Sequence, residues 1–191
     1  METGKRVLGE EHPDTLTSIA NLALTYQNQG RLKETEELGL MVVETRKRVL
    51  GEEHPDTLKT IGNLVLTYQH QGRLKEAEEL GLMLVERRKR LLGEEHPDTL
   101  TSIANLAPTK QNQGQWKETE ELQVMVMETR KRILGKDHPD TLESNANMAI
   151  IYQNQGQWKK AEELQMMVIE TRKRVLGEEH PDTQESIHIL H

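Results

Sequence analysis

The sequence predicts an all-α fold, an α-solenoid in which antiparallel helix pairs stack into a right-handed superhelix. Two observations support this prediction. The motif Leu-Gly-Glu-Glu-His-Pro-Asp-Thr, or a near copy, recurs every 42 residues, and its histidines are His12, His54, His96, His138 and His180. Between the motifs, apolar side chains follow helical spacing, and no segment alternates with the period of a strand. A fixed period of this length is typical of stacked units that bury their apolar faces on their neighbours.

The period divides the chain into four complete repeats. They cover residues 12–53, 54–95, 96–137 and 138–179. Residues 1–11 match the end of a preceding repeat, and residues 180–191 match the start of a fifth. We therefore predict a single solenoid over residues 1–191 and interpret the chain as a segment of a longer array.

Each repeat is predicted to contain two helices. In the first repeat, Leu16, Ile19 and Tyr26 share one face of a helix predicted over residues 15–30. A second helix is predicted over residues 32–51, where good helix formers separate the apolar positions. A glycine stands at the end of each helix, where a left-handed residue commonly terminates helical structure.

The repeated motif is interpreted as a helix boundary. Pro55 suits the first position of a helix, and Asp56 in the first turn is favourable to the helix dipole. The basic residues 46–48 fall in the last turns of the preceding helix, where positive charge is preferred. Whether His54 or Asp56 is the N-cap stays open at this point.

Composition disfavours several classes of function. The net charge is −7 and the pI is about 5.7, so we expect no general attraction to nucleic acid or anionic lipid. No apolar run reaches the roughly 18–20 residues that span a bilayer. The absence of cysteine excludes disulfides and cysteine-based metal sites. We expect a cytoplasmic protein that uses no cofactor.

No group of side chains predicts catalysis or metal binding. Equivalent histidines in stacked repeats would lie on the order of 10 Å apart, too far to share a zinc ion that needs bonds of about 2 Å. His188 and His191 are one turn apart on a helix, but no third ligand is evident. Recurring glutamates such as Glu34 and Glu36 are expected on a solvated helix face. We therefore expect no enzymatic activity.

Two sets of large side chains in the second helices are expected to pack against other residues. One set consists of Met41, Met83, Met125 and Met167. The other consists of Trp116 and Trp158, which replace Leu32 and Leu74. A methionine groove for hydrophobic ligands is the alternative interpretation of the first set.

The first helix resembles that of a known family. Leu22, Ala23 and Tyr26 match the Leu-Gly/Ala-x-x-Tyr signature of the tetratricopeptide repeat, and Ala77 and Ala161 match the small residue of its second helix. The period exceeds that of the usual repeat by about one turn per helix. This longer form resembles the repeats of kinesin light chains and the near-identical arrays of fungal nucleotide-binding signalling proteins. The resemblance implies an architecture but no reaction.

The resemblance also implies that the first helices line a concave face, which binds an extended peptide or a protein partner. Carried over to this sequence, the face has a central row of Asn21, Asn63, Asn105 and Asn147. The flanking positions are Thr17, Lys59, Thr101 and Glu143 on one side and Asn28, His70, Asn112 and Asn154 on the other. Amides offer both donors and acceptors to a peptide backbone. Alternatively, the asparagines hydrogen-bond between repeats.

Self-association is the alternative function. An uncapped array exposes apolar helix faces at its ends, so chains would stack end to end as homo-oligomers. Residues such as Ile187 and Leu190 would then contact another chain.

The third repeat departs from the others at Pro108, which replaces Leu24. A proline inside a helix removes one backbone hydrogen bond, here to Ala104, and costs roughly 3 kcal/mol or more. Lys110 replaces Tyr26 in the same turn. We predict a kink or a broken turn near residues 107–110.

Overall fold

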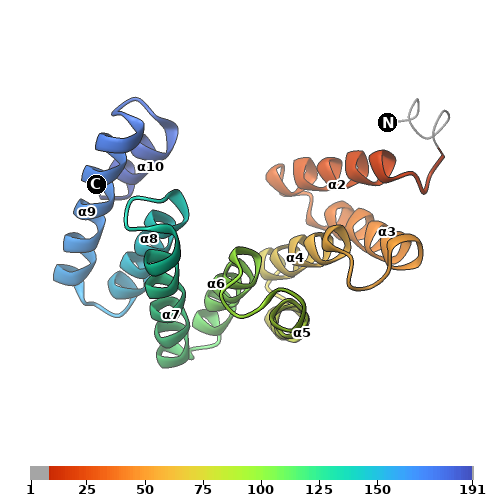
Figure 1. The fold of residues 1–191 in the computed structure, drawn as a ribbon, viewed down its shortest axis with the longest axis horizontal. Helices are drawn as coiled ribbons and strands as arrows, with labels where there is room; N and C mark the ends of the chain where they lie inside the picture. The colour runs from red at the N-terminus through yellow and green to blue at the C-terminus, as the bar shows by residue number, and fades with distance from the viewer. Residues whose placement is uncertain (1–8, 191) are drawn as a thin grey trace. The chain divides into compact units, whose positions relative to one another are not determined.

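The computed structural model describes residues 9–190, with side chains for residues 9–188, and every regular element in this part is a helix (Figure 1). The first helices of the repeats are α2 Pro13–Asn28, α4 Pro55–His70, α6 Pro97–Asn112, α8 Pro139–Asn154 and α10 Pro181–Leu190. The second helices are α3 Leu32–Leu50, α5 Leu74–Leu92, α7 Trp116–Leu134 and α9 Trp158–Leu176. The predicted all-α repeat fold is confirmed.

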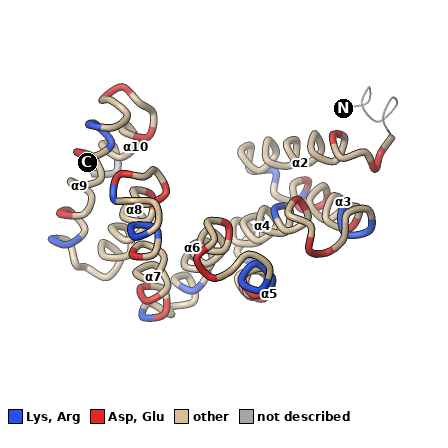
Figure 2. Tube along the Cα trace, viewed as in Figure 1, with Lys and Arg blue, Asp and Glu red and all other residues tan. Residues whose placement is uncertain are grey.

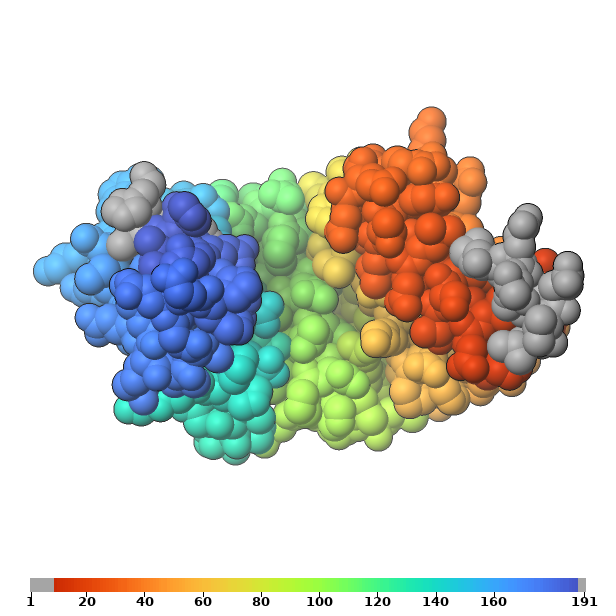
Figure 3. All heavy atoms as spheres, turned by 90° about the horizontal axis from the view of Figure 1, so that it is seen from above, coloured from red at the N-terminus to blue at the C-terminus, as the bar shows by residue number. Residues whose placement is uncertain are grey.

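The chain forms two compact units, Met1–Gln113 and Gly114–His191. In the first unit, each helix from α2 to α6 packs against the next one along the chain. In the second unit, α7 to α10 pack in the same successive way. Side chains fill the space between neighbouring helices of a unit (Figure 3). The predicted single solenoid and its right-handed superhelix concern the two units together and stay predictions.

Each first helix begins directly after the histidine of the motif, and this histidine is the N-cap. The ring Nδ1 of His54 accepts a hydrogen bond from the backbone N–H of Asp56 at 3.2 Å, while Pro55 occupies the first helical position. Acceptance from the second or third helical N–H defines an N-cap side chain. The same bond recurs at the other motifs: His12, His96, His138 and His180.

Glycine ends the two helices of a repeat in two different conformations. After α2, Gly30 has a φ of 73°, and the N–H of Arg31 donates to the Tyr26 carbonyl at 2.9 Å. This bond is typical of a left-handed helix cap. After α3, Gly51 has a φ of 99° and a ψ of 160°. That conformation lies outside the left-handed helical region and is open almost only to glycine, so the predicted left-handed ending holds for Gly30 but not for Gly51.

The core is a thin apolar layer between successive helices. Leu16 and Ile19 of α2 pack with Val42 of α3. The adjacent Val43 packs with Leu58 of α4. One side of α3 therefore packs within its own repeat, and the adjacent side packs on the next repeat. A single apolar stripe on each helix is sufficient to form this core.

Helix α6 continues through Pro108, so the predicted broken turn is wrong, while the alternative, a kink, stays a prediction. Pro108 itself is exposed, whereas the adjacent Ala107 and Thr109 are buried. On α4, the side-chain amide of Gln69 donates to the Asn105 carbonyl and to the Thr109 hydroxyl, both at 2.6 Å. These bonds hold the turn around the proline to the neighbouring helix and offset part of the cost of the missing N–H.

The two sets of large side chains in the second helices do not all pack as predicted. Trp116 is 39% exposed and Trp158 is 68% exposed. Among the four methionines of the predicted set, Met83 packs against the core. The other three are exposed: Met41, Met125 and Met167. Val42 next to Met41 is completely buried. Helical spacing locates the apolar stripe, but it does not reveal which edge of the stripe a neighbouring helix covers.

Candidate interaction surface

The predicted binding positions lie on the first helices and remain accessible to solvent. All twelve fall within the described residues, and none of their side chains is buried. In the central row, Asn21 is exposed and the other three asparagines are half-buried. The flanking positions are exposed throughout. We call these twelve residues the first-helix face.

The side-chain amides of the central row do not connect the repeats. The backbone carbonyls of Asn21 and Asn63 accept hydrogen bonds from the hydroxyls of Thr25 and Thr67 at 3.0 Å. Their side-chain amides, like those of the other two asparagines, make no hydrogen bond to any residue that the structure describes. The alternative role, in which these amides hydrogen-bond between repeats, is therefore disfavoured.

Glutamines connect adjacent first helices in the first unit. The Nε2 atom of Gln27 lies 3.0 Å from Nδ1 of His70. One repeat later, Gln69 makes the bonds to α6 described above. His70 belongs to the first-helix face, so this predicted binding position also takes part in a contact between repeats.

Arg46, predicted only to favour the helix dipole, is buried and joins three helices. Its Nη1 donates to the Asp56 carbonyl at 3.1 Å and to the Thr60 hydroxyl at 2.6 Å, both on α4. Its Nη2 donates to the Thr17 hydroxyl on α2 at 3.1 Å. Bonds from a charged donor are stronger than neutral ones. Thr17 is therefore both a predicted binding position and an acceptor within the scaffold.

The same link recurs along the array. Its donors and acceptors are Arg88 to Ser102 at 2.7 Å, Arg130 to Ser144 at 2.9 Å, and Arg172 to Ser186 at 2.5 Å. Burial lowers the pKa of Arg88, but a guanidinium stays charged in proteins. A sequence signal for this link exists, because the arginine directly before the Lys-Arg pair of each basic run stands 14 residues before a Ser or Thr.

A second link uses one of the recurring glutamates. The Nε2 atom of Gln71, after α4, donates to the carboxylate of Glu36 on α3 at 2.9 Å. Arg73 pairs with the same carboxylate at 2.6 Å. The same glutamine bond, at 2.9 Å, joins two further pairs: Gln113 to Glu78 and Gln155 to Glu120. The expectation of a fully solvated glutamate face is wrong at this position, because these carboxylates bind the next repeat.

Figure 2 marks the basic and the acidic positions along the chain trace. Exposed ion pairs join the basic ends of second helices to the acidic residues of the motifs. The pairs are Arg48 with Glu11 at 2.7 Å, Arg174 with Asp137 at 2.8 Å, and Arg90 with Glu53. Exposed pairs of this kind contribute about 0–1 kcal/mol each. They balance charge within a unit and leave the first-helix face uninvolved.

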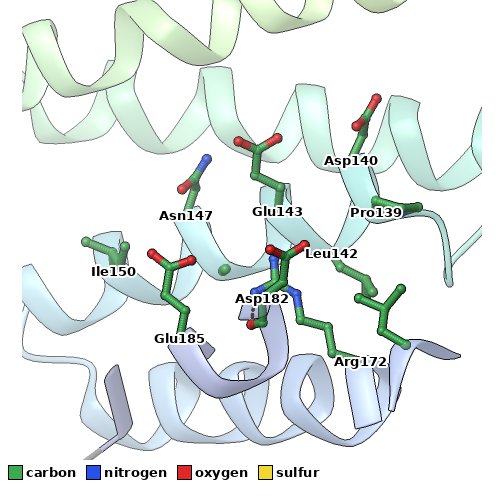
Figure 4. Close-up of a pocket in the computed structure, with 11 residues that line it drawn as sticks. Pro139, Asp140, Leu142, Glu143, Asn147, Ile150, Arg172, Asp182 and Glu185 are labelled. Atoms are coloured by element: carbon green, nitrogen blue, oxygen red, sulfur yellow. Dashed lines mark hydrogen bonds between the residues drawn. The ribbon is translucent and has the colours of Figure 1, made fainter. Parts of the chain in front are cut away.

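The second unit has a cavity of about 390 Å³ between α8 and α10, bordered by α9 (Figure 4). Glu143 and Asn147 of the first-helix face line one side, and Glu185 lies on the other. The remaining residues of the lining are Pro139, Asp140, Leu142, Ala146, Ile150, Arg172, Leu176 and Asp182. A cavity between α2, α3 and α4 in the first unit is far smaller, about 20 Å³. The sequence predicts the helix face but not the cavity.

An apolar position on the same helix face escaped prediction. It is occupied by Leu24, Leu66 and Ile150, with Pro108 in the third repeat. Leu24 is 38% exposed and Ile150 is 40% exposed. Each lies three residues after an asparagine of the central row, which places the two side chains one turn apart on one face. The sequence pattern that could have predicted this position is a recurring apolar residue among the polar residues of the first-helix face.

The described residues hold no group of three His, Asp or Glu side chains that could bind a metal ion. His191 lies outside the described residues, as does the side chain of Leu190. No helix of the described part is long and apolar enough to cross a bilayer.

Comparison with known proteins shows the family. Models of the tetratricopeptide repeat match residues 15–56, 57–98 and 104–174. The crystal structure of nearly identical TPR-like repeats from a kinesin light chain-like protein of Podosopora anserina is 36% identical, covers 94% of this chain and 85% of that chain, and has a TM-score of 0.74. A single-residue variant of it is 34% identical, with 94% and 84% covered and the same TM-score. The chain belongs to the tetratricopeptide repeat family.

A third structure extends the likeness in fold. BtubC (BKLC) from P. vanneervenii is 20% identical, covers 99% of this chain and 76% of that chain, and has a TM-score of 0.77. No curated protein sequence matches the chain. Tetratricopeptide repeats generally mediate interactions between proteins, and this defines the class of function at the level of the family.

Proposed function

We propose that the chain is a non-enzymatic scaffold that binds a peptide or protein partner on its first-helix face. One observation carries this proposal. The asparagine row is accessible and its amides are not consumed, while other residues, such as Arg46 and Gln71, make the hydrogen bonds between repeats. Asparagine amides that the scaffold does not need for its own bonds are available to a partner.

The chemistry of the face favours an extended peptide. The amide of Asn63 can donate to and accept from a peptide backbone, while the apolar position beside it, Leu66, offers contact to a partner side chain. Lys59 is the one Lys or Arg among the twelve positions. Such a face does not supply the clustered Lys or Arg that would hold a C-terminal carboxylate.

The test uses peptides selected from a random display library against the full chain. Their affinities are measured by fluorescence anisotropy for the native chain and for a double variant, Asn63→Ala with Asn105→Ala. Loss of two amide contacts should weaken binding roughly tenfold. The control variant, Glu79→Ala with Glu86→Ala, changes exposed second-helix positions and should bind as the native chain does.

Circular dichroism accompanies each variant in that test. Unchanged affinity in a folded double asparagine variant would contradict the proposal. Unfolding of the same variant would assign the asparagine row to stability, and the proposal would then fail at these residues.

Self-association by end-to-end stacking is the second candidate. Helix α10 packs against α9, and Ile187 on it keeps part of its side chain accessible. An apolar side chain in that position is available to a second copy of the chain. Sedimentation equilibrium over a wide range of concentration tests this, because stacking predicts an average mass that rises with concentration. A constant monomer mass would contradict it.

A further inference from the structure

We propose that the cavity between α8 and α10 accepts a lysine or arginine side chain of the partner, so that the second unit selects a basic segment. This inference rests on the proposed function, because it names the chemistry of an occupant of the same face. It goes further by placing a specificity-determining site in one unit.

The lining of the cavity combines an apolar wall with charged edges. Leu142, Ala146 and Ile150 of α8 contribute apolar surface, and Asn147 adds an amide. A basic side chain has the same division, since its aliphatic stem favours apolar contact while its charged end favours carboxylates and water. The volume of about 390 Å³ is at the lower end of the range for ligand pockets, roughly 300–1,000 Å³. It suits a single side chain with the adjoining backbone.

The charge of the lining is strongly negative. Four carboxylates border the cavity: Asp140, Glu143, Asp182 and Glu185. One cation faces them, Arg172, and its Nη1 is already bonded to the Asp182 carbonyl at 2.9 Å and to the Ser186 hydroxyl at 2.5 Å. Figure 4 shows Glu185 extending from α10 toward α8, where Glu143 and Asn147 lie along the same helix.

A second cation reduces this charge only in part. Arg130, buried on α7, lies 3.7 Å from the carboxylate of Glu143. The two guanidinium groups, those of Arg172 and Arg130, do not balance the four carboxylates, so the cavity keeps an excess of negative charge. Charge complementarity therefore favours a cationic occupant over a neutral or acidic one.

The array itself shows that these glutamates are not part of the repeat scaffold. Glu143 and Glu185 occupy equivalent positions in their repeats, and the earlier repeats have Thr17, Lys59 and Thr101 there. The residues around this position are largely unchanged. The structure contains the same first helix with each of these side chains. Folding therefore does not require a carboxylate here, and the acidic pair distinguishes the second unit from the first.

The experiment titrates the full chain with three tripeptide probes that differ only in the central residue. They are acetyl-Ala-Arg-Ala-amide, acetyl-Ala-norleucine-Ala-amide and acetyl-Ala-Glu-Ala-amide. Binding is followed by NMR through the methyl signals of Ile150 and Ala146, which line the cavity. We expect saturable shifts with the arginine probe and none with the glutamate probe, and we expect weak or absent shifts with norleucine.

A matched pair of variants tests the acidic residues. The double variant Glu143→Thr with Glu185→Thr carries the side chain found at Thr17 and Thr101. Its affinity for the arginine probe should be roughly tenfold lower than that of the native chain. Glu162→Thr with Glu163→Thr removes the same charge from exposed positions on α9 and should leave the affinity within about twofold.

Equal binding of the arginine and norleucine probes would overturn the inference, as would an unchanged affinity in the Glu143/Glu185 variant. The basic specificity and the proposed scaffold function can be contradicted separately. If library peptides lose affinity when Asn63 and Asn105 are replaced, but the Ile150 signal does not respond to the arginine probe, the scaffold function stands. The basic specificity of the cavity is then contradicted. Library peptides that ignore the asparagines would contradict the proposed function whatever the tripeptides show.

Discussion

The guanidinium of Arg46 donates a hydrogen bond of 2.6 Å to the Thr60 hydroxyl, and this bond crosses from the second helix of one repeat to the first helix of the next. The Thr60 hydroxyl in turn donates to the Asp56 carbonyl at 2.8 Å. Nη1 and Nη2 of this buried guanidinium are hydrogen-bonded, whereas its buried Nε has no partner among the described residues. The interface between repeats is therefore held by a recurring polar link in addition to apolar packing.

Removing this link should destabilise the array. Replacement of Arg88 by Met keeps most of the side-chain stem but leaves the Ser102 hydroxyl and the Asp98 carbonyl without their charged donor. We expect a loss of roughly 2 kcal/mol in the free energy of unfolding, measured by urea denaturation. Arg90→Met, which breaks an exposed pair with Glu53, is the control and should cost less than about 1 kcal/mol. Equal losses in the two variants would contradict the structural role of Arg88.

The histidine caps should contribute to stability one helix at a time. His54→Ala deletes the acceptor for the Asp56 N–H and should cost about 1 kcal/mol. His54→Asn restores a good N-cap acceptor and should retain most of the native stability. Thermal and urea unfolding compare the three chains. A loss in the Asn variant as large as that in the Ala variant would show that the ring serves another purpose.

Reverting the proline of the third repeat should stabilise the chain. Pro108→Leu restores the backbone N–H of α6 and the side chain present at Leu24 and Leu66. Because the helix is continuous and Gln69 already supports this turn, we expect a gain below the full cost of about 3 kcal/mol. A melting temperature higher by several degrees is expected, at roughly 2–4 °C per kcal/mol. An unchanged or lower melting temperature would contradict this account of Pro108.

Acid should weaken the link between the second and third repeats. The hydrogen bond from Gln113, followed by that from Lys110, lowers the pKa of Glu78. A carboxyl whose pKa is lower in the folded chain stabilises the fold fully above its unfolded pKa, which is about 4.3. This contribution is lost as the pH falls through the lowered folded value. The free energy of unfolding is measured with urea from about pH 6 to about pH 3, a range that brackets the reference pKa of a glutamate. It should depend less on pH in Glu78→Gln than in the native chain. The same slope in both would contradict the assignment.

The helices could be predicted from the sequence because each rests on local information. The apolar stripe of Leu16 and Ile19, the proline after each motif histidine and the glycines between helices all act within one or two turns of chain. The identity of the N-cap could not be predicted in this way, because His54 and Asp56 are both suitable acceptors by type.

The polar links could not be predicted in the same way. Arg46 and Glu36 look like surface residues by composition, and their burial depends on how closely the next repeat approaches. The exposure of Trp158 depends on the same approach. The candidate site shares this limit, because the sequence identifies the accessible asparagines, whereas the cavity bordered by Glu143 and Glu185 exists only through the packing of α8, α9 and α10.

The most direct test of the central claim locates a bound peptide on the folded chain. A library-selected peptide carrying a spin label is added, and paramagnetic broadening is measured for methyl signals on the two kinds of helix. We expect broadening at Leu24 and Leu66 on the first helices, while Met41 and Met125, exposed on the second helices, keep sharp signals. Broadening at the methionines with sharp signals from Leu24 and Leu66 would contradict it.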